Sequence, residues 1–335
     1  MRNETRVLFN QYTGHLATLN GVISVAQKFT VAPSVQQKLE NIIQEKSDFL
    51  KQINIIGVPE KTGEKLGLGV SAPIASTTNT ALQARSPRDL TGVDIIDDYD
   101  CTQTNYDTFI PYAKLDAWAK FPDFQLRIRD LIAERQALDR IMIGFNGTHR
   151  AATSNPTLNP LLQDVNIGWI EKVRLNSPQR LLSGGATAGE IHIGATGDYK
   201  NLDALVYALV NDFIDPWYQE DTKLVVICGR SLLADKYFPL VNANHAPTDQ
   251  IAADTLISQK RMGGLQAVRV PNFPANKIMV TRLDNLSIYF QEGARRRNVV
   301  EKSELDRIEN YESSNDAFIV ENYGMVAVAE NIILD

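Results

Sequence analysis

Apolar residues recur in alternating steps of four and three between Phe121 and Gly147, which places them along one face of a helix. These apolar positions are Phe124, Ile128, Leu131, Leu138, Met142 and Phe145. Pro122 suits the first turn of a helix, where backbone amides have no intrahelical partner, and Gly147 is typical of a helix end. The pattern predicts a helix of about 25 residues, roughly 37 Å long, which needs more than one packing partner.

A second helix is predicted from Pro33 to Ile53. Its apolar stripe consists of Val35, Leu39, Ile42, Phe49 and Ile53, with Lys46 in the remaining slot. Residues 1–31 predict a shorter amphipathic helix followed by a polar passage. The apolar face of this N-terminal segment is too small to fold alone, so we expect it to be separable from the rest of the chain.

The sequence pattern changes in residues 57–112, where closely spaced glycines and prolines disfavour a helix. Residues 63–74 and 99–112 can both be extended, and together they predict a long two-stranded ribbon. A lone hairpin is only marginally stable in water. We therefore expect the ribbon to pack on another element, and a neighbouring subunit is the obvious candidate.

The remainder of the chain mixes helical and extended patterns. A helix is predicted at 162–178 and a glycine-rich hairpin at 183–200. An α/β unit follows, with a helix at 201–214, a buried strand at 223–228 and further strands to the end of the chain. These elements predict an α+β protein, and 335 residues are enough for two packed units.

Composition narrows the class of protein. With 44% hydrophobic and 22% charged residues the chain is typical of globular proteins, and its net charge of −6 argues against tight binding of nucleic acid through phosphates. The first residues are polar where a signal peptide needs an apolar core, and no apolar run reaches bilayer length, so we expect no membrane association. Cys101 and Cys228 are far apart, which favours a reducing compartment.

The search for catalytic motifs yields little. Residues 67–72, GLGVSA, have the glycine spacing of a dinucleotide-binding turn, but Pro73 follows where a helix should begin. The chain has no phosphate-binding P-loop and no GxSxG nucleophile turn. The four histidines are scattered without metal-binding spacing: His15, His149, His192 and His245. The absence of motifs does not exclude catalysis, because catalytic groups can assemble from distant positions, but it leaves an enzyme hypothesis without a named residue. No cofactor and no metal site are indicated either.

Four arginines are candidates for contacts between subunits. Arg135 is the charged residue on the predicted apolar stripe, so it should pair with Asp139 one turn later or with a carboxylate of a neighbouring subunit. Arg295, Arg296 and Arg297 follow a glycine at a strand end. A solvated turn is the simpler interpretation of this triplet, and a carboxylate or phosphate contact is the alternative.

Blocks of sequence along nearly the whole chain form a recognisable set. They are KFTVAPSVQQKL, SDFLKQINI, GEKLGLGVSAPIASTT, DFQLRIRDLI, LQDVNIGW, DPWYQEDTKLVVICGRSLLADKYFP, ISQKRMGGLQAVRVPNFP and ENYESSND. In this order they closely resemble the major capsid proteins of tailed phages of the peduovirus kind.

This resemblance implies the capsid fold that tailed phages share with herpesviruses. The implied parts are an N-terminal segment (1–31), an N-arm with a P-domain helix (32–56), an E-loop (57–112), a P-domain (113–200) with its spine helix at 121–147, an A-domain (201–312), and C-terminal strands that return to the P-domain (313–335).

The resemblance also implies a structural role in an icosahedral head around packaged double-stranded DNA. The implied partners are further copies of the chain in hexamers and pentamers, a scaffolding protein, a portal protein and a maturation protease. The matching cleavage region lies at Phe29, Thr30 and Val31, and assembly is implied in the host cytoplasm.

Two alternatives remain open at this point. An encapsulin-like shell subunit would share the fold and enclose an enzyme instead of a genome. A cytoplasmic α/β enzyme would rest on residues 201–292 alone and would be a monomer or small oligomer with a ligand pocket.

Overall fold

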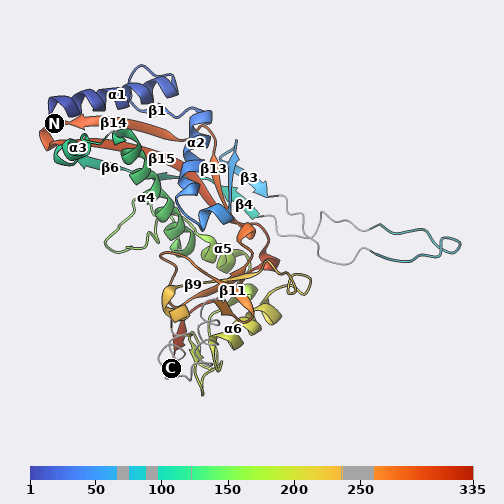
Figure 1. Ribbon diagram of the computed structural model, residues 1–335. Helices are drawn as coiled ribbons and strands as arrows, with labels where there is room; N and C mark the ends of the chain where they lie inside the picture. Colours follow the sequence, from blue (N-terminus) through green and yellow to red (C-terminus); the bar gives the residue numbers. More distant parts are fainter. Residues whose placement is uncertain (66–74, 88–96, 122, 235, 237–259, 335) are drawn as a thin grey trace, which may run out of the picture.

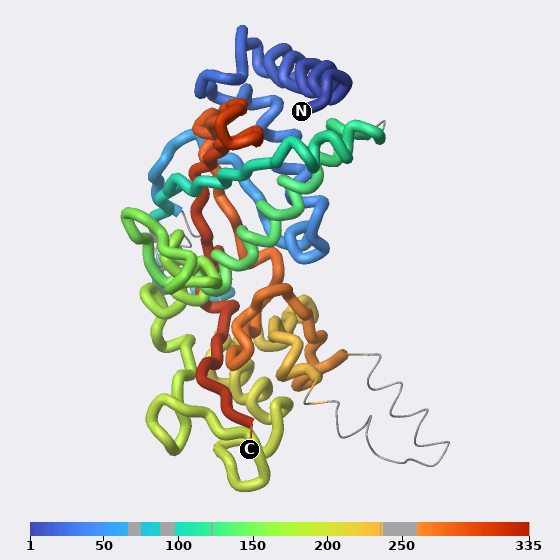
Figure 2. The backbone as a smooth tube through the Cα atoms, turned by 90° about the vertical axis from the view of Figure 1, so that its left-hand side faces the viewer, coloured from blue at the N-terminus to red at the C-terminus, as the bar shows by residue number. Residues whose placement is uncertain are grey.

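The protein is elongated, with two β-sheets placed one after the other along its length and helices packed beside them (Figure 1). The computed structural model describes residues 1–65, 75–87, 97–121, 123–234, 236 and 260–334. A view turned by 90° shows the N-terminal helix at one end of the molecule and the C-terminus at the other (Figure 2). The helices are α1 (Asn3–Asn20), α2 (Pro33–Glu45), α3 (Tyr112–Trp118), α4 (Phe124–Asn146), α5 (Trp169–Asn176) and α6 (Leu202–Ala208).

The first sheet, called the core sheet below, has seven strands in the order β1-β14-β15-β13-β2, with β5 and β6 also paired to β15. Its longest strand, β15, pairs with β13, β14, β5 and β6, all antiparallel, whereas β13 and β2 are parallel. The strands are β1 (Phe29–Thr30), β2 (Asn54–Val58), β5 (Thr102–Asn105), β6 (Thr108–Pro111), β13 (Leu286–Gln291), β14 (Arg296–Lys302) and β15 (Arg307–Val320).

The second sheet, called the distal sheet, has six strands in the order β10-β11-β9-β12-β16-β7. They are β7 (Leu181–Leu182), β9 (Val225–Cys228), β10 (Arg261–Met262), β11 (Leu265–Arg269), β12 (Ile278–Thr281) and β16 (Ala327–Ala329). The predicted buried strand at 223–228 is confirmed as β9. Val225 and Ile227 belong to the central core that contacts α4, and Val226 and Cys228 belong to a second core beneath α6, so this strand is covered on both faces.

The predicted long helix is confirmed as α4, which begins at Phe124 and has Asp123 as its N-cap residue. Pro122 lies outside the described residues. The predicted face of this helix was partly wrong, because Leu131 is 52% exposed while Arg140 is fully buried. The face that packs inward runs through small and polar side chains, which a count of apolar residues does not detect. Its buried members include Ala133, Gln136, Ala137 and Arg140.

The helix predicted at 33–53 is shorter than expected. α2 ends at Glu45, and a turn leads into a short 3₁₀ helix at Leu50–Gln52. Lys46 forms an ion pair with Asp130 of α4 at 3.0 Å and is not part of a continuing apolar face. The chain reverses after it, which still brings Phe49 into the core.

The predicted ribbon is confirmed at its base, but it takes up fewer residues than the range 57–112. β3 (Thr62–Lys65) pairs antiparallel with β4 (Asp97–Asp100), and residues 75–87 lie far from the body (Figure 1). β2, β5 and β6 belong instead to the core sheet, because they pair with its strands. Residues 67–72, whose glycines resemble a dinucleotide-binding turn, lie outside the described residues.

Sheet pairing also divides the C-terminal half differently from the expected ranges. The range 201–312 spans both sheets, because β13, β14 and the start of β15 lie in the core sheet. The hairpin predicted at 183–200 was wrong: β8 (Ile191–Ile193) pairs in parallel with β17 (Ile332–Leu334) near the C-terminus. A local pattern cannot reveal a strand partner that lies 141 positions further along the chain (332 − 191), as it does here.

A close crossing of α4 and α5 packs both helices against the core sheet. Trp169, at the start of α5, is fully buried and stacks edge-on against Phe145 and Phe318, with ring centroids 4.9 and 5.4 Å apart. Its indole N–H donates to the Ser287 carbonyl at 3.0 Å. Gly144 of α4 leaves room for this ring, since a Cβ there would lie 2.2 Å from the indole. The aromatic group therefore requires glycine at this position of α4.

Candidate assembly surfaces

The ribbon is anchored at its base and free of the body at its described tip. Tyr99 packs edge-on against Tyr289 of the core sheet at 5.4 Å, and Lys65 donates from Nζ to the Val320 carbonyl at 2.5 Å. At the tip, the backbone hydrogen bonds of residues 75–87 are confined to a turn in which Leu82 and Gln83 donate to Asn79. Leu82 is 84% exposed. The tip therefore gains no core from its own chain among the described residues.

The predicted cleavage region is part of the core sheet. Phe29 and Thr30 pair with Arg297 and Arg296 of β14, and the Val31 amide donates to the Arg295 carbonyl at 2.9 Å. Phe29 and Val31 are buried, whereas Thr30 is exposed. A protease must therefore separate this strand from β14 before it can bind residues 29–31 in an extended form.

The arginine triplet is split between inside and outside. Arg295 is completely buried and forms ion pairs with Glu40 and Glu312 at 2.6 and 2.5 Å, so its proposed role as an intersubunit contact was wrong. Arg297 also points inward, where its Nε donates to Asn310 Oδ1 at 2.7 Å. Arg296 is exposed. Because residues two apart in a strand share a face, strand alternation could have predicted that Arg295 and Arg297 point inward and that Arg296 points outward.

Arg135 is exposed on α4 and forms an ion pair with Asp139 at 2.5 Å. This is the intrahelical partner that its spacing predicts. Burial raises the pKa of Asp139, and Arg135 opposes that shift. Arg135 and Arg296 remain open to a neighbouring subunit, whereas Arg295 does not.

A network of buried charges lies where α2, α4 and the core sheet meet, and sequence reasoning missed it. Arg140 of α4 donates to Glu40 of α2 through both terminal nitrogens and to Asp316 of β15 at 3.2 Å. Arg295 donates to Glu40, to Glu312 and to the Gln136 side chain. Each of these side chains is at most 3% exposed. The network therefore cross-links three elements that are far apart in the sequence.

The charges of this network support one another. Burial raises the pKa of Glu40, but Arg140 and Arg295 outweigh burial and hold that pKa below its usual value of 4.5. Burial likewise opposes ionisation of Glu312, and Arg295 and Arg297 lower its pKa overall. Buried ion pairs of this kind add little net stability compared with apolar packing, but removing one partner strands a charge. The network is therefore favourable only when α2, α4 and the core sheet are packed correctly, because any other arrangement leaves a buried charge unpaired.

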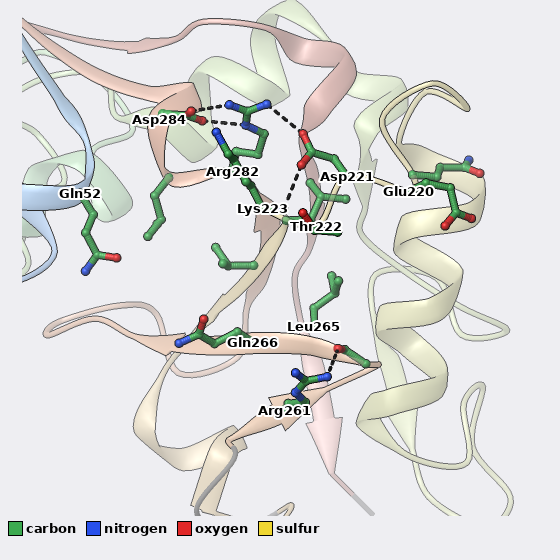
Figure 3. A pocket seen from close by; sticks show the side chains of 15 residues that line it. Gln52, Glu220, Asp221, Thr222, Lys223, Arg261, Leu265, Gln266, Arg282 and Asp284 are labelled. Carbon is green, nitrogen blue, oxygen red and sulfur yellow. Dashed lines mark hydrogen bonds and ion pairs between the residues drawn. The ribbon is translucent and has the colours of Figure 1, made fainter.

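An open groove lies between the loop before β9, the β10–β11 turn and the segment after β12 (Figure 3). It has a volume of about 730 Å³. Arg282 lies at its upper end between Asp221, at 2.8 Å, and Asp284 (Figure 3). Hydrogen bonding to Asp284 and Asp221 raises the pKa of Arg282 despite partial burial. Asp221 and Asp284 thus neutralise the charge of Arg282 at this end of the groove.

Other chemistry is not assembled in the described part of the chain. No group of three or more histidine, cysteine or acidic side chains is close enough there to hold a metal ion. Both cysteines are buried and unpaired, and burial raises the pKa of Cys101 to about 12 and that of Cys228 to about 11. Among the described residues, no helix is long and apolar enough to cross a membrane.

Together, the two sheets, the long helix α4 and the projecting ribbon have the architecture of a tailed-phage capsid subunit. Residues 8–332 match the model of the phage major capsid protein, P2 family, and the chain belongs to this family.

Individual relatives agree with the family match. The chain is 51% identical to capsid proteins of Escherichia phage P2, over 99% of this chain and 95% of the relative. It is 42% identical to the major capsid protein of Serratia phage KSP20, over 99% and 97%. A solved procapsid of satellite phage P4, which includes a size determination (Sid) protein, holds a chain 49% identical with a TM-score of 0.83, over 100% of this chain and 99% of that one.

The protein is therefore a major capsid protein with the tailed-phage capsid fold, and it is a structural protein, not an enzyme. The interpretation as an α/β enzyme based on residues 201–292 is wrong, because the match covers nearly the whole chain. The encapsulin alternative has no comparable support, since the relatives with high identity are phage capsid proteins.

Proposed function

We propose that this subunit forms hexamers and pentamers of an icosahedral head that encloses packaged double-stranded DNA. Assembly takes place in the host cytoplasm with a scaffolding protein and a portal protein, and a phage protease then cuts within residues 29–31. The observation that carries the proposal is the family match over residues 8–332, together with the described tip of the ribbon at 75–87, where Leu82 is exposed.

Under this proposal the ribbon is the E-loop and lies over an adjacent subunit. α4 is the spine of the P-domain with the core sheet, and the distal sheet with α6 forms the A-domain. Contacts of modest strength suffice in such a shell, because each added subunit meets several neighbours and symmetry closes the assembly. Arg135 and Arg296 are exposed cations available for these contacts.

The net charge of −6 suits a container for DNA, because a wall that bound phosphates strongly would hold back the genome. Contact with the enclosed DNA is then weak and independent of sequence. Purified subunits should show no tight binding to duplex DNA at physiological salt in a filter-binding assay. Nanomolar binding under those conditions would contradict this part of the proposal.

Electron microscopy after co-expression with the scaffolding and protease genes of the same phage tests the proposal most broadly. Closed shells that form with the scaffold, and a new N-terminus near Ala32 detected by mass spectrometry when the protease is present, are the expected results. Discrete small oligomers under all conditions would rule out the shell, whereas shells with an intact N-terminus would rule out only the cleavage.

A further inference from the structure

The N-terminal helix α1 lies in a built groove. The floor of this groove, called the N-groove below, is apolar and comes from α3, the first half of α4, β14 and β15. α1 lies along β14 (Figure 1), and its N-terminal end contacts Asp116 of α3. It places Phe9 and Tyr12 on this floor, and each is only 7% exposed. The floor residues are Leu115, Phe124, Ile128, Val299 and Ile308.

Polar contacts around the N-groove fix the position of the helix. Arg6 donates two hydrogen bonds to the Glu301 carboxylate, at 2.5 and 2.8 Å, and this fork geometry sets both direction and register. Arg297 Nη2 donates to the Tyr12 hydroxyl at 3.0 Å. The backbone N–H of Arg2 donates to Asp116 at 2.9 Å. The helix is thus held by matched apolar and charged groups along its length.

The chain after α1 is exposed for a short stretch. Gly21 ends the helix in a left-handed conformation, with φ at 64°, and Ile23 and Ser24 are exposed. Ile23 makes no buried contact, with an exposed fraction of 105%. The strand β1 is bound to β14 separately, by its own backbone pairing. The helix and the strand are therefore two attachments joined by a linker that is exposed at Ile23 and Ser24. Val25, which follows, is buried, and its carbonyl accepts from the Val299 amide at 2.8 Å.

We propose that the N-groove is a binding site for an amphipathic helix and that α1 occupies it as a detachable ligand of this same chain. Cutting the linker leaves α1 bound. The apolar floor becomes available only when the helix departs, so departure and not chain cleavage is the step that changes the surface. This proposal does not depend on whether a phage protease acts near Val31.

The free energy of detaching α1 includes the loss of its helical structure as well as the loss of its contacts with the N-groove. An isolated helix of 18 residues is marginal in water, so α1 loses most of its structure when it leaves the N-groove. Binding of the severed helix is then coupled to its folding, as in other helix-in-groove interactions, and Phe9 is its main anchor. Its opposite face carries Val7, which is 56% exposed.

The test uses the whole chain with the recognition sequence of a specific protease inserted between Ile23 and Ser24. After the purified protein is cut, size-exclusion chromatography at micromolar concentration should show the N-terminal fragment eluting with the body. Phe9→Ala should weaken retention roughly a hundredfold, because truncating a buried phenylalanine removes its contacts and leaves a cavity. Arg6→Glu should also release the fragment, since it places like charge against Glu301. Val7→Ala is the matched control and should retain it.

Two results would overturn the proposal. One is complete separation of the wild-type fragment on cutting, which would show that the covalent link and not the N-groove holds α1. The other is equal retention of the wild-type and Phe9→Ala fragments, which would show that the fragment binds elsewhere.

Discussion

The tip of the ribbon and the charge network at the centre of the body differ in where their side chains find partners. Both contain side chains that are unfavourable without a partner, buried charges in the network and an exposed apolar side chain at the tip. The network satisfies Arg140 and Arg295 inside one chain, whereas Leu82 at the tip has no buried contact in that chain. The network is thus complete within one subunit, whereas the proposed function assigns the tip a partner on a neighbouring subunit.

Breaking the network should have the largest effect on the subunit. Arg140→Met should lower the free energy of unfolding by about 3–5 kcal/mol, because Glu40 and Asp316 lose their shared cation in a buried place. Urea denaturation followed by tryptophan fluorescence measures this. A loss below about 1 kcal/mol would mean that the network is solvated and that the contrast with the ribbon is wrong.

The network should also make the subunit sensitive to acid. The folded pKa values of Glu40 and Glu312 are lowered, so the stability that they contribute is complete above their unfolded pKa near 4.5 and is lost as the pH falls through the folded values. Glu312→Gln should reduce the slope of stability against pH below 4.5, and the exposed Glu304→Gln should leave that slope unchanged. Equal slopes for both variants and the wild type would contradict the assignment.

The crossing of α4 and α5 gives an effect of intermediate size. Gly144→Ala adds a methyl group 2.2 Å from the Trp169 ring, and we expect a loss of about 1–3 kcal/mol from overpacking. Gly14→Ala is the matched control, because a Cβ on that residue of α1 meets nothing within 4 Å. It should be neutral or stabilising. Greater stability of Gly144→Ala would show that the crossing is loose.

Exposed groups should change the subunit least. Arg135→Leu removes a surface ion pair with Asp139 and should cost at most about 1 kcal/mol in subunit stability. Any larger consequence should appear in assembly, measured as particle yield by sedimentation. If this variant also assembles normally, Arg135 has no role between subunits.

The elements of this fold that depend on local patterns could be predicted from the sequence. The period of α4, the continuous apolar run of β9 and the glycine-rich start of the ribbon are all patterns within short windows. The pattern also placed Leu131 inside and left Arg140 unnoticed, since Arg140 is buried by partners 100 and 176 positions away. No local rule reports such a partner, and buried charge is uncommon enough that an apolar stripe is the better first expectation.

The candidate contact and cleavage residues also depend on partners that are distant in the sequence. The three adjacent arginines have identical chemistry, and only the alternation of the extended chain entering β14 sends Arg295 inward and Arg296 outward. The region 29–31 could be located from the family resemblance, but its pairing with β14 could not, because the strand partner lies near residue 297. The ribbon was predictable because glycine and proline spacing is local. The surface on which it packs was not, because no described residue of the same chain covers its tip.

The central claim is that the ribbon serves the shell and not the subunit, and replacing residues 66–96 with an Asn-Gly turn tests it most directly. Lys65 and Asp97 are register partners, so this two-residue turn can close β3 and β4 into a short hairpin. The shortened subunit should unfold within about 0.5 kcal/mol of the wild type and yield no robust shells in sedimentation after co-expression with the scaffold. Shells at normal yield, or a subunit that no longer folds, would contradict the claim.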